Sequence, residues 1–184
     1  MKNYEAHEEL IENFEKNSSE LYQLALLLTG NTDRSVEAFS RAIDFDEEKN
    51  PVFGGFMNAW ARKLIVVKAL GTMEKELRAS KQRVARTMGD EAAGDVKWKR
   101  RAHIAREEFE EAVIAIDAFP RCAMLLTIFE GTSIEDAAVL LNADESLTAA
   151  AQRIGIVQLT RNLAGSGGRD PYPGMNPVPV LSLS

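Results

Sequence analysis

Cysteine, histidine and long apolar runs are nearly absent from this 184-residue chain, and each shortage excludes a class of protein. Cys122 is the single cysteine, so no internal disulfide can form, and two isolated histidines leave little with which to build a zinc site. The longest apolar runs, such as Leu64–Val67 and Ala123–Leu126, are far shorter than the roughly 18 residues that a membrane span needs. The first residues are acidic, where a secretory signal would be basic and then apolar. These absences predict a cytoplasmic protein that uses no membrane, metal or cofactor.

Residues that commonly carry catalysis also form no recognisable pattern. His7 is followed by Glu8, but the second histidine of a zinc-protease motif would fall at Ile11. The glutamates at 107–111 are typical of the solvated face of an amphipathic helix, and Cys122 opens an apolar run as a small buried residue does. The sequence therefore predicts that the protein is not an enzyme.

Charge is distributed unevenly along the chain. Residues 1–73 have a net charge of −4, residues 74–106 of +5 and residues 107–184 of −7. A shift of composition of this kind commonly marks a change of role along a chain. The pattern suggests two acidic modules joined by a basic connector.

Apolar residues recur with helical spacing nearly throughout, and no sustained alternation indicates a strand. The clearest stripe runs from Phe56 through Trp60 to Leu70 and is typical of a core-facing helix. We therefore predict an all-α fold. Helices are expected near Leu10 and Phe14 and over residues 17–29, 33–44, 56–70, 105–116, 121–130, 133–141 and 144–163.

We predict two small helical domains over residues 1–73 and 107–163, joined by a basic linker over residues 74–106 and followed by a disordered tail over residues 164–184. The first cations of the linker continue the helical phase without apolar partners, which predicts a solvated helix or a mobile linker. Two roles for the linker stay open: contact with nucleic acid or polymerase, and service as a soluble hinge. The Pro-rich tail is expected to be an inert extension, and docking into an aromatic groove is the alternative.

One constellation in the second module has the spacing of a helix-turn-helix. A short helix containing Ala137, capped by Ser133, is followed by a tight turn at Asn142 and by a helix that opens near Asp144 and turns Leu147 inward. A plain corner between two helices explains the same pattern, and this interpretation stays open.

Four segments together carry a family resemblance, three in the first half of the chain and one longer segment in the second half. Residues 21–30 and 33–43 precede the Phe56–Leu70 helix, and residues 118–138 contain both Phe119-Pro120-Arg121 and Gly131-Thr132-Ser133. In this order they resemble an RNA polymerase sigma factor of the extracytoplasmic-function type, a group made of sigma domains 2 and 4 and a flexible linker. The likeness runs over about residues 20–163.

The resemblance implies contact residues for two partners, RNA polymerase core and promoter DNA. The helix that corresponds to the polymerase-binding helix of sigma domain 2 carries Glu37, Ser40, Arg41 and Asp44. The aromatic helix that faces the promoter −10 element carries Trp60, Arg62 and Lys63. The last helix, which in the family enters the major groove at the −35 element, carries Thr148, Gln152 and Arg153.

Two features of the residues bear on DNA binding. Trp60 lies on an apolar stripe, so core packing is the other interpretation of this side chain. The second module is acidic, and Asp144 and Glu145 stand at the start of its last helix, where like charge opposes a phosphate.

Three hypotheses follow from these observations. The first is a sigma-factor-like bacterial transcription initiation protein that binds polymerase core and promoter DNA. The second is a sigma mimic that has lost promoter recognition and acts by binding an anti-sigma factor or another regulatory protein. The third is an unrelated helical adaptor, which would be favoured if the two halves packed as one continuous bundle.

Overall fold

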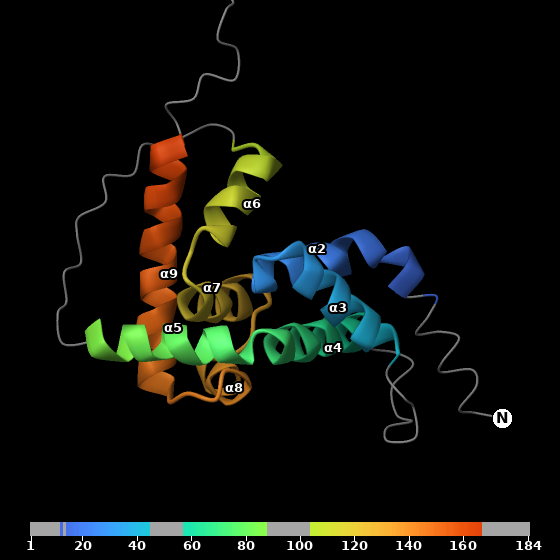
Figure 1. The fold of residues 1–184 in the computed structure, drawn as a ribbon, viewed down its shortest axis with the longest axis horizontal. Coiled ribbons are helices and arrows are strands. Elements are labelled where there is room, and N and C mark those ends of the chain that lie inside the picture. Colours follow the sequence, from blue (N-terminus) through green and yellow to red (C-terminus); the bar gives the residue numbers. More distant parts are fainter. Residues whose placement is uncertain (1–11, 13, 45–56, 88–103, 167–184) are drawn as a thin grey trace, which may run out of the picture.

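The computed structural model describes residues 12, 14–44, 57–87 and 104–166 (Figure 1). Within these residues every regular element is helical and there is no strand, which confirms the all-α prediction. The elements are α2 (Ser18–Thr29), α3 (Thr32–Ile43), α4 (Met57–Thr72), α5 (Glu74–Thr87), α6 (Arg106–Ile114), α7 (Ala118–Met124), the π-helical segment η3 (Leu125–Phe129), α8 (Ile134–Leu140) and α9 (Glu145–Ser166).

Several helix ends lie at residues whose chemistry suits a cap. Gly30 ends α2 in the left-handed region at φ 62°, where its N–H donates to Leu26 O. The Ser133 side chain accepts a hydrogen bond from Asp136 N at the start of α8, and Asp144 accepts one from Leu147 N at the start of α9. The predicted helix end at residue 29, the predicted cap at Ser133 and the predicted helix start near Asp144 are confirmed.

The first half of the molecule consists of α2, α3 and α4, which pack on one another. Leu21, Leu28 and Ile65 are fully buried between them. Phe14, which precedes α2, is buried and meets Phe39 of α3 edge-on, with ring centroids 5.7 Å apart. The helix predicted near Leu10 lies mostly outside the described residues.

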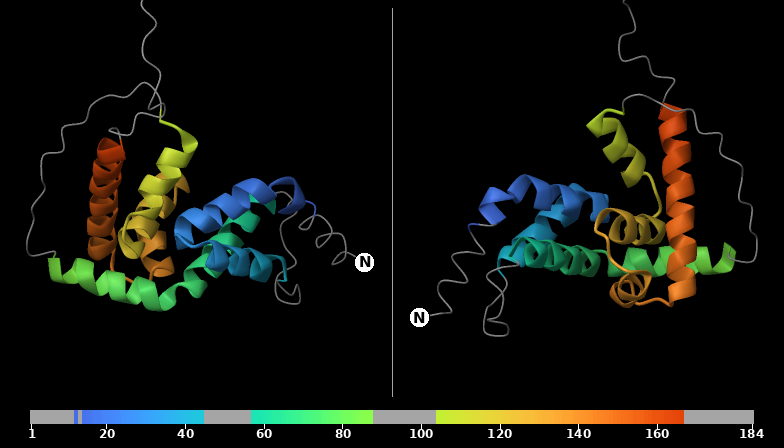
Figure 2. Two further views of the ribbon diagram at one scale, coloured as in Figure 1. Left: turned by 45° about the horizontal axis from the view of Figure 1, so that its top comes forward. Right: turned by 180° about the vertical axis from the view of Figure 1, so that it is seen from behind.

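The second half is organised around the long helix α9. Helix α7 packs across it, α6 lies beside its far end, and α8 lies near its start (Figures 1 and 2). The crossing of α7 and α9 is close, because a Cβ atom at Gly155 would stand 2.6 Å from Pro120 O. Glycine at this position therefore permits the approach of the two helices.

Helix α5 differs from the expectation for the linker. It follows α4 at an angle, as the left view of Figure 2 shows, and packs against α7 and α9, with Leu77, Ser80 and Val84 buried. These residues are spaced by three and four, so a narrow stripe exists within the charged sequence, and its middle member is a serine. Residues 74–87 form a mostly exposed helix, one of the two predicted forms, but the expectation that they lack apolar partners is wrong. The rest of the predicted linker, residues 88–103, lies outside the described residues.

The two halves share one apolar core. A single cluster of buried side chains runs from Phe14 in the first half to Ala151 on α9, and α2 contacts both α6 and α7. The division into two separate domains is therefore not evident in the packing. Helix α9 continues to Ser166, three residues beyond its predicted end, and the remaining predicted tail lies outside the described residues.

Candidate protein-binding and nucleic-acid-binding surfaces

The four residues expected to bind polymerase lie together on the exposed side of α3. Glu37, Ser40, Arg41 and Asp44 are all exposed, and Arg41 forms an ion pair with Glu37 at 2.7 Å. The opposite side of the helix carries Ser35, Ala38 and Ala42, which are buried where α3 packs on α2 and α4.

Two large apolar side chains lie among these polar residues. Val36 is 51% exposed and Ile43 is 36% exposed. We call the set Val36, Glu37, Ser40, Arg41, Ile43 and Asp44 the α3 face. Scattered exposed aliphatic residues are ordinary on a protein surface, but here they are flanked by charges on one helix, as in many protein interfaces.

The residues expected to bind a melted DNA strand are arranged differently on α4. Trp60 is half-buried and packs against the core, as its alternative interpretation held, whereas Lys63 is exposed. Arg62 points across to the second half, where its Nε and Nη2 atoms donate to both carboxylate oxygens of Glu130, at 2.9 and 2.6 Å. The hydrogen bond to Glu130 raises the pKa of Arg62 against the opposing effect of burial.

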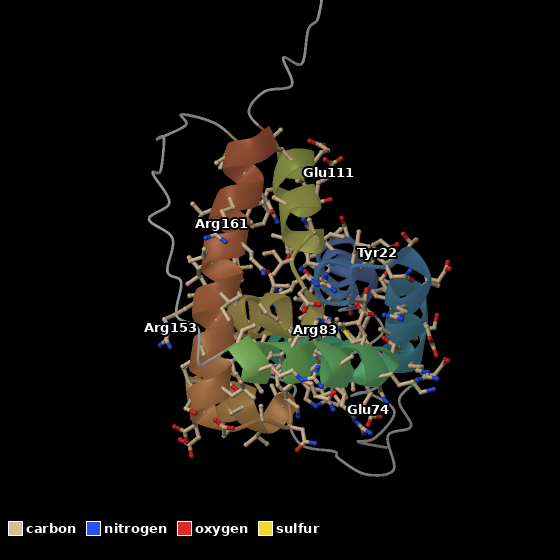
Figure 3. All side chains as sticks on the ribbon, turned by 60° about the vertical axis from the view of Figure 1, so that its left-hand side comes forward. Tyr22, Glu74, Arg83, Glu111, Arg153 and Arg161 are labelled. Atoms are coloured by element: carbon tan, nitrogen blue, oxygen red, sulfur yellow. The ribbon has the colours of Figure 1, made fainter. Side chains whose placement is uncertain are left out.

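The residues expected to read duplex DNA on α9 are largely engaged inside the protein. Thr148 is fully buried and donates its hydroxyl to Asp144 O, so the prediction that it contacts DNA is wrong for this conformation. Gln152 donates to the Thr127 hydroxyl at 3.0 Å. Arg153 alone of the three is exposed and points away from the neighbouring helices (Figure 3).

The backbone of this region still has the order of helix, turn and helix. Helix α8 ends at Leu140, Asn142 adopts a left-handed φ of 48° in the turn, and α9 begins at Glu145. Ala137 is fully buried, as expected for a small residue where two helices approach. The local geometry fits the predicted spacing, but Thr148 and Gln152 do not present their side chains as a reading surface would.

Two residues that join the halves were not singled out from the sequence. Arg121 on α7 is only 4% exposed, and its guanidinium donates to backbone carbonyls at the ends of α2 and α6. A single charge within the apolar run of residues 118–126 was the available signal. For Glu130 no sequence signal existed, because its partner lies 68 residues away.

None of the described residues gather into a group of three or more histidine, cysteine or acidic side chains suited to a metal. In the same part of the chain, no helix combines the length and apolarity that crossing a bilayer requires. No family model, no curated protein and no solved structure matches this chain.

Proposed function

We propose that the protein works by binding other proteins through the α3 face, and that RNA polymerase core is its partner in a sigma-like role. The carrying observation is that Glu37, Ser40, Arg41 and Asp44 lie together and exposed, beside two exposed aliphatic side chains. Burying such side chains under a partner removes apolar area from water, and the surrounding charges select the partner.

Promoter recognition has less support than polymerase binding. Of the side chains expected to touch DNA, Thr148 is buried, Gln152 bonds to Thr127 and Arg62 is paired with Glu130. Phosphate contacts by lysine and arginine supply most of the affinity for duplex DNA, and the second half is acidic. We therefore propose protein binding, and not DNA binding, as the main function of the protein.

A pull-down with purified bacterial polymerase core tests the proposal. The test variant is Val36→Ser/Ile43→Ser, which removes the apolar part of the α3 face without changing charge. We expect it to weaken core binding by about tenfold or more, because truncated apolar anchors carry much of the energy of an interface. Ile156→Ser is the matched control, since Ile156 is 41% exposed on α9.

Two outcomes would overturn the proposal. One is a wild-type protein that does not retain core. The other is a double variant that binds core as tightly as the Ile156→Ser control does.

A sigma mimic is the second candidate, favoured by the shared core of the two halves. A protein that does not need to spread its halves along a promoter can keep them packed together. This candidate predicts that the protein displaces a sigma factor from an anti-sigma factor and does not initiate transcription with core. The same shared core is what the adaptor hypothesis expected, and binding to neither core nor an anti-sigma factor would favour that hypothesis.

A further inference from the structure

A polar cavity lies where the two halves of the molecule meet. It has a volume of about 480 Å³, within the range of sites that hold a small metabolite. The loop between α2 and α3, helix α5 and the loop between α6 and α7 all contribute to its lining. Its charged lining residues are Arg34 on α3, Glu76 on α5, and Asp117 and Arg121 at α7.

The charges at this cavity do not cancel. Glu76 pairs with Arg34, and both carboxylate oxygens of Asp117 accept hydrogen bonds from Arg83, at 3.0 and 2.6 Å. Arg121 is only 4% exposed, and in the described part of the chain its guanidinium bonds to backbone carbonyls and to no acid. Three arginines therefore stand against two acids, which leaves an excess of one positive charge.

The helix ends at the cavity do not remove this excess. Helices α2 and α6 end there, at Thr29 and Ile114, and bring the negative ends of their dipoles. Helices α3 and α7 begin there, at the N-caps Asn31 and Asp117, and bring two positive ends. Because two helix ends of each sign meet, their contributions largely cancel, and the cavity remains suited to an anion.

Arg34 is the side chain that can turn toward such an anion. Its guanidinium bonds to Glu76 through Nη1, and the Arg34 and Glu76 side chains are 38% and 40% exposed. An ion pair this exposed contributes little to stability, so its exchange for another anion costs little. A guanidinium also offers paired N–H donors that match the oxygens of a phosphate or a carboxylate.

We propose that this cavity binds the oxyanion group, a phosphate or a carboxylate, of a small metabolite, with Arg34 as its hydrogen-bond donor and the buried charge of Arg121 as a second attraction. Arg34 belongs to the first half of the molecule and Arg121 to the second, so the bound anion stabilises the contact between the halves. The inference goes beyond the proposed function, which depends on the α3 face and not on Arg34.

Isothermal titration calorimetry and thermal melting test the proposal, with sodium phosphate, glucose 6-phosphate and sodium succinate as probes. Sodium chloride keeps the ionic strength equal throughout, and glucose is the uncharged control. We expect saturable binding of at least one oxyanion and none of glucose. The bound probe should raise the melting temperature, because it binds the folded protein alone. The comparison of phosphate with succinate shows which oxyanion the site prefers.

Two substitutions should change the affinity in opposite directions. Arg34→Gln removes the donor and should weaken binding about tenfold. Glu76→Gln frees Arg34 and adds a positive charge to the balance, and should tighten binding about threefold or more. Arg78→Gln and Glu74→Gln are the matched controls, because Arg78 and Glu74 form an exposed ion pair on α5 that does not line the cavity.

A third variant fills the cavity without changing its charge. Ala115 lines the cavity at an exposed position, so Ala115→Phe should weaken binding, which keeps the proposal testable if Arg34→Gln does not fold. Unchanged binding in Ala115→Phe would contradict the assignment of the site.

Three further results would overturn the inference. The first is that the wild-type protein binds none of the oxyanion probes. The second is that sodium chloride at the same ionic strength raises the melting temperature equally. The third is that Arg34→Gln and Glu76→Gln behave as their α5 controls do, since a general charge effect would then explain any binding. Polymerase pull-down with the α3-face variants needs none of these probes, so the two proposals fail separately.

Discussion

Two arginines join the halves of this molecule, and they do so in different chemical surroundings. Arg121 is buried, and its guanidinium donates to carbonyls of Leu28, Thr29, Ile114 and Ile116 at distances of 2.8–3.3 Å. Arg62 lies at the edge of an open groove and is held by the carboxylate of Glu130.

The difference separates a contact to backbone groups from a contact to a side chain. Three of the carbonyls around Arg121, those of Leu28, Thr29 and Ile114, belong to the last turns of α2 and α6, whose last backbone acceptors have no partners within their own helices. A cation there also complements the negative ends of both helix dipoles. Four backbone carbonyls at fixed positions hold Arg121, whereas the side-chain carboxylate of Glu130 holds Arg62.

Among the changes considered at the contacts between the two halves, removal of the Arg121 guanidinium should lower the stability of the protein most. Arg121→Met keeps the apolar stem and leaves four carbonyls without their donor around a side chain that is largely buried. We expect the free energy of unfolding to fall by about 4 kcal/mol, as measured by urea denaturation.

The reactivity of Cys122 gives a second measure of the contact between α7 and α2. Burial raises the pKa of the Cys122 thiol to about 12, and its Sγ lies 3.6 Å from Leu28 O. In wild-type protein it should resist thiol reagents until the protein unfolds, and in Arg121→Met it should react faster under native conditions. Unchanged stability and unchanged thiol reactivity would show that the Arg121 contacts do not hold the halves together.

Gly30 lies against the Arg121 guanidinium, so a substitution at Gly30 tests how closely this site is packed. A Cβ atom at Gly30 would lie 2.8 Å from the Arg121 guanidinium, and its backbone is left-handed at φ 62°. Gly131 has almost the same φ of 66° but open space around it. Gly131→Ala should therefore cost only the backbone term of about 1 kcal/mol, whereas Gly30→Ala should cost about 2 kcal/mol or more. Equal thermal shifts for the two variants would argue against a tight Arg121 site.

Much of the fold could be predicted from the sequence, because helical periodicity and capping are local properties. The stop of α2 at Gly30 and the starts of α8 and α9 depend on residues within one turn of each end. The packing of α5 was missed, since its buried stripe includes a serine and is surrounded by charge.

The candidate site was predicted less well than the fold. On α3 the outward residues follow directly from the buried Ser35, Ala38 and Ala42, so the expected face is exposed. The start of α9 contains three consecutive alanines at 149–151, and small residues on all sides do not specify which face turns outward. Thr148 was expected to contact DNA because the resemblance places the contact one residue after the inward-facing Leu147, and the structure buries both residues. The pairing of Arg62 with Glu130 depends on tertiary structure alone.

The ion pair between Arg83 on α5 and Asp117, the N-cap of α7, is more exposed than the Arg121 contacts. Burial alone would raise the pKa of Asp117, but hydrogen bonds from Arg83, Ser80 and the Ala118 N–H lower it overall. A lowered pKa means that the pair stabilises the protein above the ordinary carboxyl range, near pH 4, and that this stabilisation is lost as the pH falls through the folded-state pKa.

Asp117→Asn, which keeps a residue suited to capping α7, should lower the melting temperature slightly at neutral pH, about pH 7, and have no effect well below the carboxyl range, at about pH 2. The shift should be smaller than that of Gly30→Ala, because Arg83 is largely exposed. A larger loss in acid than at neutral pH would contradict this assignment.

Glu130→Gln should have the smallest effect on stability. This substitution compares the Arg62 contact directly with the Arg121 contacts. Arg62 remains partly exposed, can still donate to the amide oxygen of the substituted side chain and has the Glu20 carboxylate within 3.9 Å. The free energy of unfolding should therefore fall by less than about 1 kcal/mol. A loss as large as that of Arg121→Met would mean that both arginines hold the halves together. A small loss would mean that the Arg62–Glu130 pair, unlike the Arg121 contacts, contributes little to folding.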